Sequence, residues 1–562
     1  MTQTPEQALQ AALLSHNGGQ MEEAEHQYRT VLRADPHHPT ANHNLGVLMV
    51  QTGQAAQGLP YLITALETDP AHEMFWLSYL DALIAADRLA VASQVVAQSR
   101  EMGVPEEGIE RLKERLEHGI TRRGGVPDAP NASEAALRAT LNIQSWNTGS
   151  TAAGRGDPPL VLFDWLVHHT FGWGVYGLNL VLNGSAQGRI TPASTAQDRM
   201  AIIGSTSTHH HVAHPNPLAQ PIMDHFYRNS MRLYQWMCHK SAPFTLPWPV
   251  LHGLGNGLHI TQNRMPNGLR YHGAPSIGIL ALEQTRLDQE ARDRAARLAL
   301  IVTCSSWNTE ILEDAGIGPA ITVIQGIDPT LFHPAPRAGW LKHRFTVFSG
   351  GKLEFRKGQD LVLLAFRAFA RRHPEALLVT AWHSPWPELA RNLATNPKVA
   401  PVPFEPTGRV DVTGWAVANG LAPEQVLDLG QVPNTRLPPL LREMDVALFP
   451  NRGEGGTNLV AMECMACGVP VILSRNTGHL DLIQPDNCLP LEWQKPMPDR
   501  GLYRGWGESN VEEMVEALET CYQEREPARQ RGAKGAAMMG ELTWSRQIAR
   551  LTDAIAPYCG WS

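Results

Sequence analysis

The stretch DVALFPNRGEGGTNLVAMECMACGVPVILS, Asp445–Ser474, decides the fold of the larger part of this chain. Val446–Phe449 is an apolar run of strand length, and Pro450–Thr457 is rich in Pro, Gly and Asn, which predicts a loop. Asn458–Cys467 has a helical composition and is ended by a glycine and a proline, after which Val469–Leu473 restarts as a strand. The stretch therefore predicts a strand, a glycine loop, a helix and a second strand.

A glycine loop that opens a helix predicts an anion site. The unpaired N–H groups at the helix start, here near Thr457 and Asn458, and the positive end of the helix dipole attract a phosphate. Glu454 stands on the loop and Glu463 on the helix. A carboxylate inside such a unit is well placed to accept hydrogen bonds from sugar hydroxyls.

The second half of this unit, Ala461–Ile472, resembles the signature E-A-M-A-x-G-x-P-V-V of the retaining GT-B glycosyltransferases of the group 1 family. The resemblance implies an α/β GT-B fold, with two Rossmann-like domains facing a cleft, and gives Glu463 the role of ribose ligand for a sugar nucleotide. The family's two glutamates stand eight positions apart, whereas Glu454 and Glu463 stand nine apart and Gly455 takes the strict position. Glu454 is therefore a sugar contact only if the loop is one residue longer, and otherwise a loop acid without a role.

A second block, FTVFSGGKLEFRKGQDLVLLAF at Phe345–Phe366, predicts a buried strand, a glycine turn and a helix. It is similar to the family pattern G-R-L-x-x-x-K-G, whose Arg and Lys hold the donor diphosphate. Gly351 and Lys357 match, but Lys352 replaces the arginine, so that a point charge replaces a planar fork. The resemblance assigns Lys352 and Lys357 to the diphosphate, with neighbouring Arg356 as an alternative fork. A solvated basic turn is the other interpretation.

A third block, Ile301–Pro334, is similar to the family's strand, helix and strand that end in N-G-V-D-x-x-x-F-x-P. Gln325, Gly326, Asp328 and Phe332 reproduce that ending. In the family this segment leads into the hinge between the two domains. The three blocks also stand in the family's order, which a single motif would not guarantee.

A glycine pattern marks the predicted start of the amino-terminal domain. Leu160–Trp165 predicts a strand and Val175–Leu182 a helix, and the G-x-G-x-x-G between them begins with Gly172 and Gly174. Taken alone, this pattern is a weak signal for dinucleotide binding. A dinucleotide site also requires an acid about 20 residues further on, near Asp198. In the family the glycine loop after the first strand faces the cleft, which assigns Gly172 and Gly174 to donor or acceptor binding.

Family members often place a histidine near the donor, after a strand of the amino-terminal domain. The matching strand here is Ile277–Leu282, and the expected position holds Glu283 or Gln284. Glu283 is therefore a candidate catalytic residue that contacts acceptor or donor, with a helix-start acid as the alternative. The histidines that are candidates for the family's role instead are His168, His169 and His252.

The run His209–His211 with His214 invites a metal-site interpretation. No Cys or acid stands at a ligand spacing beside it, so a polar loop is favoured. Enzymes of this family usually do not depend on a bound metal. We therefore expect no metal and no bound cofactor, with a nucleotide diphosphate sugar, UDP- or GDP-linked, as the donor substrate.

The amino-terminal region repeats itself. Gly19 and Gly53 stand 34 residues apart, and GQMEEAEHQYRTVLRADP and GQAAQGLPYLITALETDP are two copies of one unit, followed by a degraded third copy from Ala71 to Val104. A 34-residue period of paired helices is the tetratricopeptide (TPR) signature, and such solenoids offer a groove to a peptide or protein partner. A spacer or a dimerisation surface is the alternative.

Composition narrows the class of protein. The 562 residues carry a formal net charge of −8 and 7 cysteines without a disulfide framework, and core packing explains Cys464 and Cys467. The acidic balance argues against general nucleic-acid binding. The sequence shows no apolar run of about 18 residues and no secretion signal. We therefore expect a cytoplasmic protein without a transmembrane segment, with peripheral membrane contact left open.

These features predict five parts of the chain: TPR repeats at 1–117, a linker with one helix (132–141) at 118–158, the GT-B amino-terminal, acceptor-side domain at 159–336, the carboxy-terminal donor domain at 337–539, and a helix and tail at 540–562. In the family such a terminal helix crosses back onto the first domain.

The resemblance implies retaining sugar transfer to a glycan, a lipid-linked glycan or a protein acceptor. Lys352 and Lys357 would neutralise the leaving diphosphate, Glu463 would hold the ribose and Glu454 the sugar, while no residue is assigned as a nucleophile. Two alternatives stay open. One is a non-catalytic TPR scaffold with a degenerate GT-B fold, favoured by Lys352 and the shifted Glu454. The other is a nucleotide-sugar epimerase of the same fold, which needs no acceptor.

Overall fold

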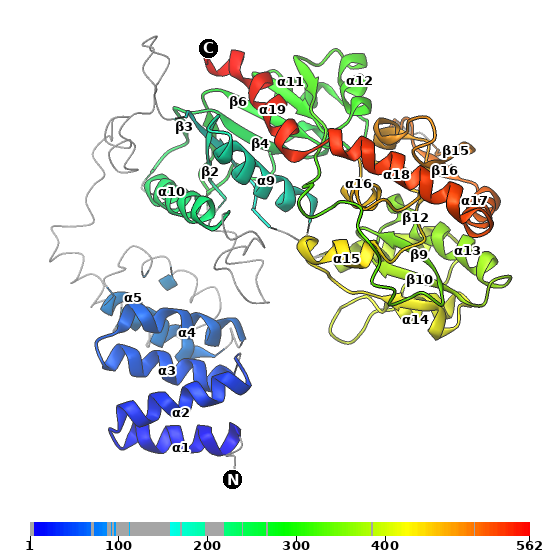
Figure 1. Cartoon of the computed structure of the whole chain (residues 1–562). Helices are drawn as coiled ribbons and strands as arrows, with labels where there is room; N and C mark the ends of the chain where they lie inside the picture. The colour runs from blue at the N-terminus through cyan, green and yellow to red at the C-terminus, as the bar shows by residue number, and fades with distance from the viewer. Residues whose placement is uncertain are drawn as a thin grey trace. The chain divides into compact units, whose positions relative to one another are not determined.

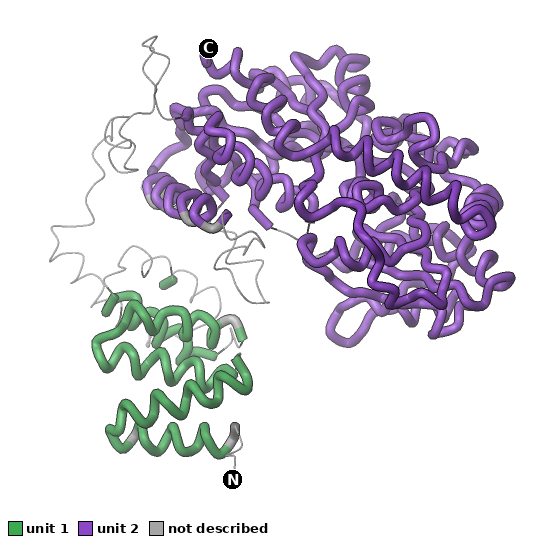
Figure 2. Tube along the Cα trace, viewed as in Figure 1, with its two compact units in different colours: residues 1–133, 202–207 green, residues 134–201, 208–562 purple. Residues whose placement is uncertain are grey.

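The computed structural model describes residues 5–36, 38–68, 72–86, 92, 95, 96, 112, 158–168, 171–196, 219–238, 240–265, 268–383, 386–498 and 501–561. They belong to two compact units, which Figure 2 colours separately. Several predicted features lie outside the described residues: the linker helix at 132–141, much of the second half of the third repeat, Asp198, His169 and the histidines from His209 to His214.

The first unit is helical. Its described helices are α1 (Pro5–Asn17), α2 (Met21–Ala34), α3 (Pro39–Gln51), α4 (Ala55–Thr68) and α5 (Glu73–Ala85), and each packs against the next (Figure 1). Equivalent positions of the two sequence copies take the same conformation: Gly19 and Gly53, with φ of 76° and 78°, both form left-handed turns. Gly58 lets α4 approach α3, because a Cβ there would stand 2.7 Å from the carbonyl oxygen of Gly46. The predicted helical amino-terminal region is confirmed.

The second unit contains two parallel sheets. The first sheet has the order β2-β1-β4-β6-β7-β8, and its neighbouring strands all run parallel. Its strands are β1 (Leu160–Phe163), β2 (Thr191–Ser194), β4 (Val250–Leu254), β6 (Ser276–Leu280), β7 (Leu300–Thr303) and β8 (Ala320–Thr322). Fully buried runs such as LVLF in β1 and LIVT in β7 are typical of parallel strands that are covered on both faces.

The described helices of this first domain are α9 (Gly172–Ala186), α10 (Gln220–Cys238), α11 (Gln289–Ala295) and α12 (Ser306–Asp314). A small two-stranded sheet pairs β3 (Phe244–Leu246) with β5 (Tyr271–Gly273), and both strands lie between α10 and β6 in the sequence.

The second sheet has the order β11-β10-β9-β12-β13-β14, again with every neighbouring pair parallel. Its strands are β9 (Phe345–Gly350), β10 (Ala376–Ala381), β11 (Val426–Asp428), β12 (Val446–Phe449), β13 (Val471–Ser474) and β14 (Leu489–Leu491). Its helices include α13 (Gln359–Ala370), α14 (Val412–Ala418), α15 (Leu437–Leu441), α16 (Leu459–Ala466) and α17 (Val511–Gln523), and a hairpin of β15 (Gln494–Pro496) and β16 (Gly507–Ser509) follows β14. Two parallel-sheet domains in series are the GT-B-like arrangement that the sequence predicted.

The strand order of the second sheet reverses between β9 and β12. Open α/β sheets bind ligands at the carboxyl ends of the strands at such a switch point. The segments that follow β9 and β12 are the two loops to which the sequence assigns phosphate binding. The topology therefore brings both predicted loops to the same edge of the sheet.

The structure corrects the predicted glycine loop of the first domain. Gly172 and Gly174 lie in the first turn of α9, which begins at Gly172 and not at Val175. Gly174 lets the helix approach the preceding segment, because a Cβ there would stand 2.6–2.9 Å from atoms of His168. Glycine disfavours helix interiors, so its density predicted a loop, but close packing at this helix start outweighs that preference.

The two carboxy-terminal helices connect the domains of the second unit. α18 (Arg525–Glu541) packs on α16, and α19 (Trp544–Cys559) packs on α9 (Figure 1). The rings of Trp544 and Tyr176 stack with centroids 5.4 Å apart, and the Gln187 side chain donates to the Ser545 carbonyl oxygen at 2.8 Å. In the described part of the chain, no helix combines the length and the apolar character needed to cross a membrane.

Candidate active site

The loops after β9 and β12 bring two of the predicted residues into an ion pair. The Lys357 ammonium contacts one carboxylate oxygen of Glu454, and the side-chain amide of Asn451 donates to the same oxygen. Arg356 donates to the other oxygen at 2.9 Å. The Glu454 backbone N–H donates to the Thr477 hydroxyl at 2.7 Å. Both carboxylate oxygens of Glu454 are therefore held by donors of its own domain.

Arg356 joins this pair to two more carboxylates. Its Nη2 lies 2.6 Å from Glu354 and 2.8 Å from Glu283, which comes from the first domain, in the segment after β6. The backbone N–H of Glu283 donates to the Asn256 side chain at 3.1 Å, which fixes that segment. The structure thus places Glu283 and Glu454, the two predicted catalytic residues, on one guanidinium. Glu283 is not at a helix start, because α11 begins further along the chain.

Lys352 lies at the outer side of the same group. Its ammonium is 3.6 Å from a Glu354 oxygen and 5.8 Å from the centre of the Trp386 ring. Gly351 precedes it with φ of 111°, a left-handed conformation that suits glycine, and a Cβ there would stand 3.8 Å from the aliphatic stem of Lys357. We call the six ionised residues Lys352, Glu354, Arg356, Lys357, Glu454 and Glu283 the charge cluster.

Burial and pairing act in opposite directions on the acids of the charge cluster. Burial alone would raise the pKa of Glu454, but Lys357 and Arg356 lower it to about 2. Burial likewise opposes ionisation of Glu354, yet Arg356 and the two lysines bring its pKa below the ordinary value. Burial lowers the pKa of Lys357 despite its contact with Glu454. Glu454 thus stays ionised at neutral pH and holds a cation on each oxygen.

Glu463 lies in a different environment, on α16. It is 4% exposed, and the hydrogen-bond partner of its carboxyl group in the described chain is the Asn434 side-chain amide. Burial raises the pKa of Glu463 to about 8. The residue lines a small pocket between the two domains, together with residues of α9, residues of the segment 326–332 and Trp544, the first residue of α19. A buried carboxyl facing an interdomain pocket can accept hydrogen bonds from a ligand's hydroxyl groups.

The substitution Glu463→Gln is expected to stabilise the chain at pH 7 by about 2–3 kcal/mol. Between the ordinary pKa of 4.5 and the folded value of about 8, the folded protein keeps a proton that the unfolded chain releases. The stability of the natural protein therefore falls as pH rises through this window, whereas glutamine needs no proton. Chemical denaturation at about pH 5, 7 and 9 checks this, and a gain that does not grow with pH would contradict it.

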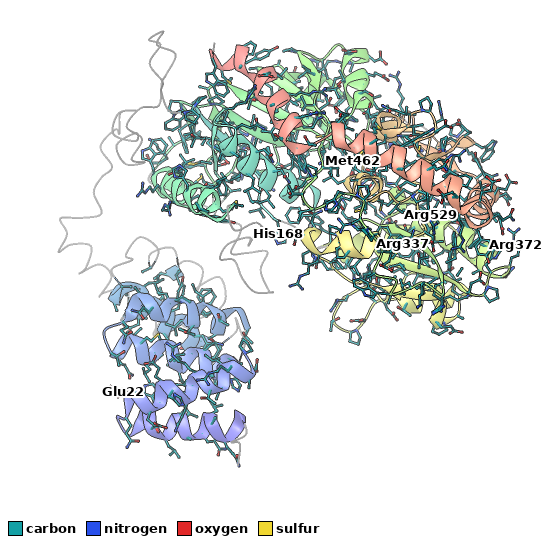
Figure 3. The ribbon with its side chains drawn as sticks, viewed as in Figure 1. Glu22, His168, Arg337, Arg372, Met462 and Arg529 are labelled. Carbon is teal, nitrogen blue, oxygen red and sulfur yellow. The ribbon has the colours of Figure 1, made fainter. Side chains whose placement is uncertain are left out.

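The start of α16 is held in an unusual conformation. Asn458 precedes the helix with φ of 63°, and its side-chain nitrogen lies 3.1 Å from His479 Nε2. Burial lowers the pKa of His479 to about 4, so the ring is neutral. The Thr457 hydroxyl donates to the sulfur of Met462, a buried residue labelled in Figure 3. The first turn of any helix leaves N–H groups without an intrahelical partner, and these contacts fix where that turn of α16 begins.

Two glycines set how closely the loops approach. A Cβ at Gly455 would stand 2.5 Å from the Leu282 carbonyl oxygen, in the segment of the first domain that carries Glu283. A Cβ at Gly478 would stand 1.8 Å from the Gly456 carbonyl oxygen. Neither position has room for a side chain. The loop after β12 is therefore packed directly against the first domain.

The structure separates the predicted residues into two groups. Gly351, Lys352, Lys357, Glu454 and Glu283 lie in or beside the charge cluster, whereas Thr457, Asn458 and Glu463 belong to α16 and its start. A Cβ at Gly172 would be 3.8 Å from Leu459 of α16, so this glycine lies beside the second domain, while Gly174 packs on His168.

Sequence reasoning missed several partners of these residues. Glu354, Asn451 and Thr477 hold the charge cluster, and Asn434 and His479 support Glu463 and Asn458. These partners come from different loops at the sheet edge, so no local pattern groups them. The one sequence signal for the charge cluster was that a second cation, Arg356, stands next to Lys357.

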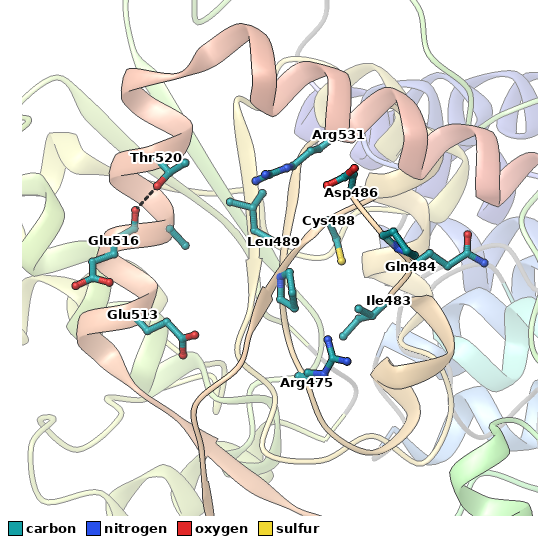
Figure 4. Close-up of a pocket in the computed structure, with 13 residues that line it drawn as sticks. Arg475, Ile483, Gln484, Asp486, Cys488, Leu489, Glu513, Glu516, Thr520 and Arg531 are labelled. Carbon is teal, nitrogen blue, oxygen red and sulfur yellow. Dashed lines mark hydrogen bonds between the residues drawn. The ribbon is translucent and has the colours of Figure 1, made fainter.

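A second pocket, of about 570 Å³, lies beside β14 and α17 and is drawn in Figure 4. Arg475, Glu513, Glu516 and Arg531 are among its lining residues, and none of the predicted site residues lines it. The more spacious pocket is thus away from the charge cluster, and the cluster, not the pocket size, marks the candidate site.

Residues 344–523 match the family described as "Glycosyl transferases group 1". This match covers β9 to α17, with the Lys357–Glu454 pair and Glu463. This part of the chain is a group 1 glycosyltransferase domain. The second sheet and both groups of site residues except Glu283, Gly172 and Gly174 lie within the group 1 domain.

Curated relatives also carry transferase names. The chain is 24% identical over 277 residues to the GDP-mannose-dependent alpha-(1-6)-phosphatidylinositol dimannoside mannosyltransferase of Mycobacterium tuberculosis, which covers 47% of this chain and 61% of the relative. It is 26% identical over 194 residues to the corresponding monomannoside mannosyltransferase of Mycolicibacterium smegmatis, covering 32% of this chain and 45% of the relative. The matches therefore span about half the length of these relatives.

Solved structures with similar chains include sucrose-phosphate synthase from Thermosynechococcus elongatus, at 15% identity and a TM-score of 0.46, covering 71% of this chain and 98% of that one. Another is a mutant O-GlcNAc transferase from Thermobaculum terrenum, at 14% identity and a TM-score of 0.40, covering 100% of this chain and 99% of that one.

Proposed function

We propose that this protein is a retaining glycosyltransferase that moves a sugar from a nucleotide diphosphate sugar to a glycan, lipid-linked or protein acceptor. The observation that carries the proposal is the group of cations at the switch point of the group 1 domain, which also carries a buried carboxyl on α16. A diphosphate and a ribose are the two ligand groups that suit these residues.

The proposed chemistry is mainly electrostatic. Lys352 and Lys357 neutralise the diphosphate as it leaves the sugar, and the N–H groups at the start of α16 add to this effect. Glu463 accepts hydrogen bonds from the ribose. Glu454 keeps Lys357 in place and, in our proposal, borders the sugar. Exclusion of water between the two domains strengthens each of these interactions.

Donor binding to Glu463 has a consequence for protons. The ribose hydroxyls donate to a carboxylate better than to a carboxylic acid, so the donor favours the ionised form of Glu463. With a pKa of about 8, raised by burial, the residue is mostly protonated at neutral pH. We therefore propose that nucleotide binding releases a proton near pH 7.

The helical amino-terminal unit is proposed to be a TPR solenoid that recruits a protein or peptide. The equivalent turns at Gly19 and Gly53 and the close α3–α4 approach at Gly58 support this proposal. The partner is either the acceptor itself or an assembly factor.

Nucleotide titration tests the proposed function. We expect micromolar binding of one of UDP, GDP and ADP by isothermal calorimetry, with close to one proton released at pH 7, seen as a dependence on buffer ionisation enthalpy. Glu463→Ala removes the proton release and weakens binding, whereas Glu512→Ala, at an exposed position of α17, changes neither. GDP-mannose is the first donor to try for turnover, because the names of both mannosyltransferases specify it.

Three outcomes would redirect the proposal. Absence of binding to every nucleotide would favour a non-catalytic scaffold with the same fold. Conversion of the free donor to another sugar without any acceptor would favour an epimerase. Binding without proton release would leave the donor site but remove Glu463 from it.

A further inference from the structure

Arg356 has a place in the charge cluster that neither lysine has. Its guanidinium lies within 2.9 Å of carboxylate oxygens of Glu354, Glu454 and Glu283, and its side chain is 7% exposed. Among the described residues, its Nε is a buried donor without a partner. A buried guanidinium with an unused N–H can donate a hydrogen bond to one more anionic oxygen.

The charge cluster contains as many carboxylates as cations: Glu283, Glu354 and Glu454 face Lys352, Arg356 and Lys357. A diphosphate brings at least two further negative charges. Adding them to a balanced and mostly buried group costs Coulomb energy that the low-dielectric surroundings enlarge. One carboxylate has to move away for the diphosphate to bind well.

Glu283 is the most exposed of the three carboxylates, so its ion pair with Arg356 is the easiest to break. The side chains of Glu354 and Glu454 are 9% and 6% exposed, whereas that of Glu283 is 36% exposed. Glu283 also comes from the first domain, while the other members of the cluster belong to the second. Its pairing with Arg356 therefore competes with water, as in a surface ion pair.

We infer that Arg356 is a third ligand of the donor diphosphate and that Glu283 occupies the place of a donor phosphate until the donor displaces it. This inference rests on the proposed function. A guanidinium here restores the planar fork that is lost where Lys352 stands in place of the family's arginine. When Glu283 leaves Arg356, the pair that bridges the two domains also breaks, so donor binding and the contact between the domains are coupled.

Affinity measurements on the full chain test both halves of the inference. Glu283→Gln removes the competing carboxylate and is expected to tighten binding of the nucleoside diphosphate about fivefold, without changing affinity for the nucleoside that lacks phosphates. Glu290→Gln is the matched control, because Glu290 is an exposed acid of the same domain, paired only with Arg294 among the described residues. It should leave both affinities unchanged.

Arg356→Gln is expected to weaken diphosphate binding at least tenfold. Arg356→Lys keeps the charge but not the planar fork, so its affinity should lie between that of the natural protein and that of Arg356→Gln. Arg372→Gln is the control, since Arg372 is an exposed arginine that pairs with Glu519 (Figure 3). Removing Arg356 takes one cationic partner from each of the buried acids Glu354 and Glu454, so circular dichroism must show that this variant is folded. Glu283 is partly exposed, and its variant does not carry that risk.

Weaker or unchanged diphosphate binding in Glu283→Gln would overturn the role of Glu283, and unchanged binding in a folded Arg356→Gln would overturn that of Arg356. Both results would leave the proposed function standing, because the natural protein would still bind its nucleotide. Failure of the natural protein to bind any nucleotide would instead overturn the proposed function and this inference together.

Discussion

Lys357→Met is expected to weaken nucleoside diphosphate binding by about 10²–10³-fold, the range seen when one partner of a buried charged contact is removed. The Lys357 side chain is 12% exposed and contacts Glu454, and Gly351 lies over its aliphatic stem. Its charge is therefore poorly screened by water, and a contact with a donor phosphate would be strong. Methionine keeps much of the stem volume and removes the charge.

The substitution also leaves Glu454 with Arg356 as its remaining cationic partner in the described chain, which adds a cost unrelated to the donor. The double variant Lys357→Met/Glu454→Gln separates the two effects, because it removes both charges of the pair. We expect the double variant to recover stability but not affinity. Lys534→Met, at an exposed lysine paired with Asp486, is the control for a charge change. Full affinity in the double variant would exclude Lys357 as a phosphate ligand.

Short-range sequence signals explain why the strand–loop–helix–strand unit could be predicted. Val446–Phe449 forms β12 as predicted, and α16 runs from Leu459 to Ala466, within the predicted Asn458–Cys467. Apolar runs, glycine loops and a proline break act over a few residues, so they are visible without knowledge of the rest of the fold. The same reasoning gave β9 and α13, and with them the second parallel sheet.

Contacts between distant segments could not be predicted in the same way. Glu283 was selected because it stands where the family places a histidine after a strand, but nothing in the sequence indicates that it meets Arg356 across the domain boundary. The pKa of Glu463 depends on burial among residues of both domains, so it could not be predicted from the sequence either. The glycines at the start of α9 show the converse: local preference predicted a loop, and tertiary packing produced a helix.

Asp360→Ala is expected to lower the free energy of unfolding by about 3–5 kcal/mol, because it breaks a buried ion pair. Asp360 stands in the first turn of α13 and receives both Nη atoms of Arg452, at 2.8 and 2.7 Å, and neither side chain is exposed. It also accepts a hydrogen bond of 2.6 Å from Asn396. Denaturant titration measures the loss. Glu492→Ala, which breaks the exposed Arg475–Glu492 pair in the same domain, should cost less than about 1 kcal/mol.

The Arg452–Asp360 pair also joins the two loops of the candidate site. Arg452 belongs to the loop after β12, and it donates through its side chain to the Phe355 carbonyl oxygen at 2.7 Å and through its backbone N–H to that of Arg356 at 2.7 Å. Replacing both partners by apolar residues, as in Arg452→Met/Asp360→Leu, should restore most of the stability that the single variant loses. The double variant still lacks the side-chain link that sets the distance between Lys357 and the start of α16. We therefore expect it to be stable but to bind nucleotide at least tenfold more weakly than the natural chain. Recovery of stability and affinity together would mean that the pair stabilises the fold without positioning the site.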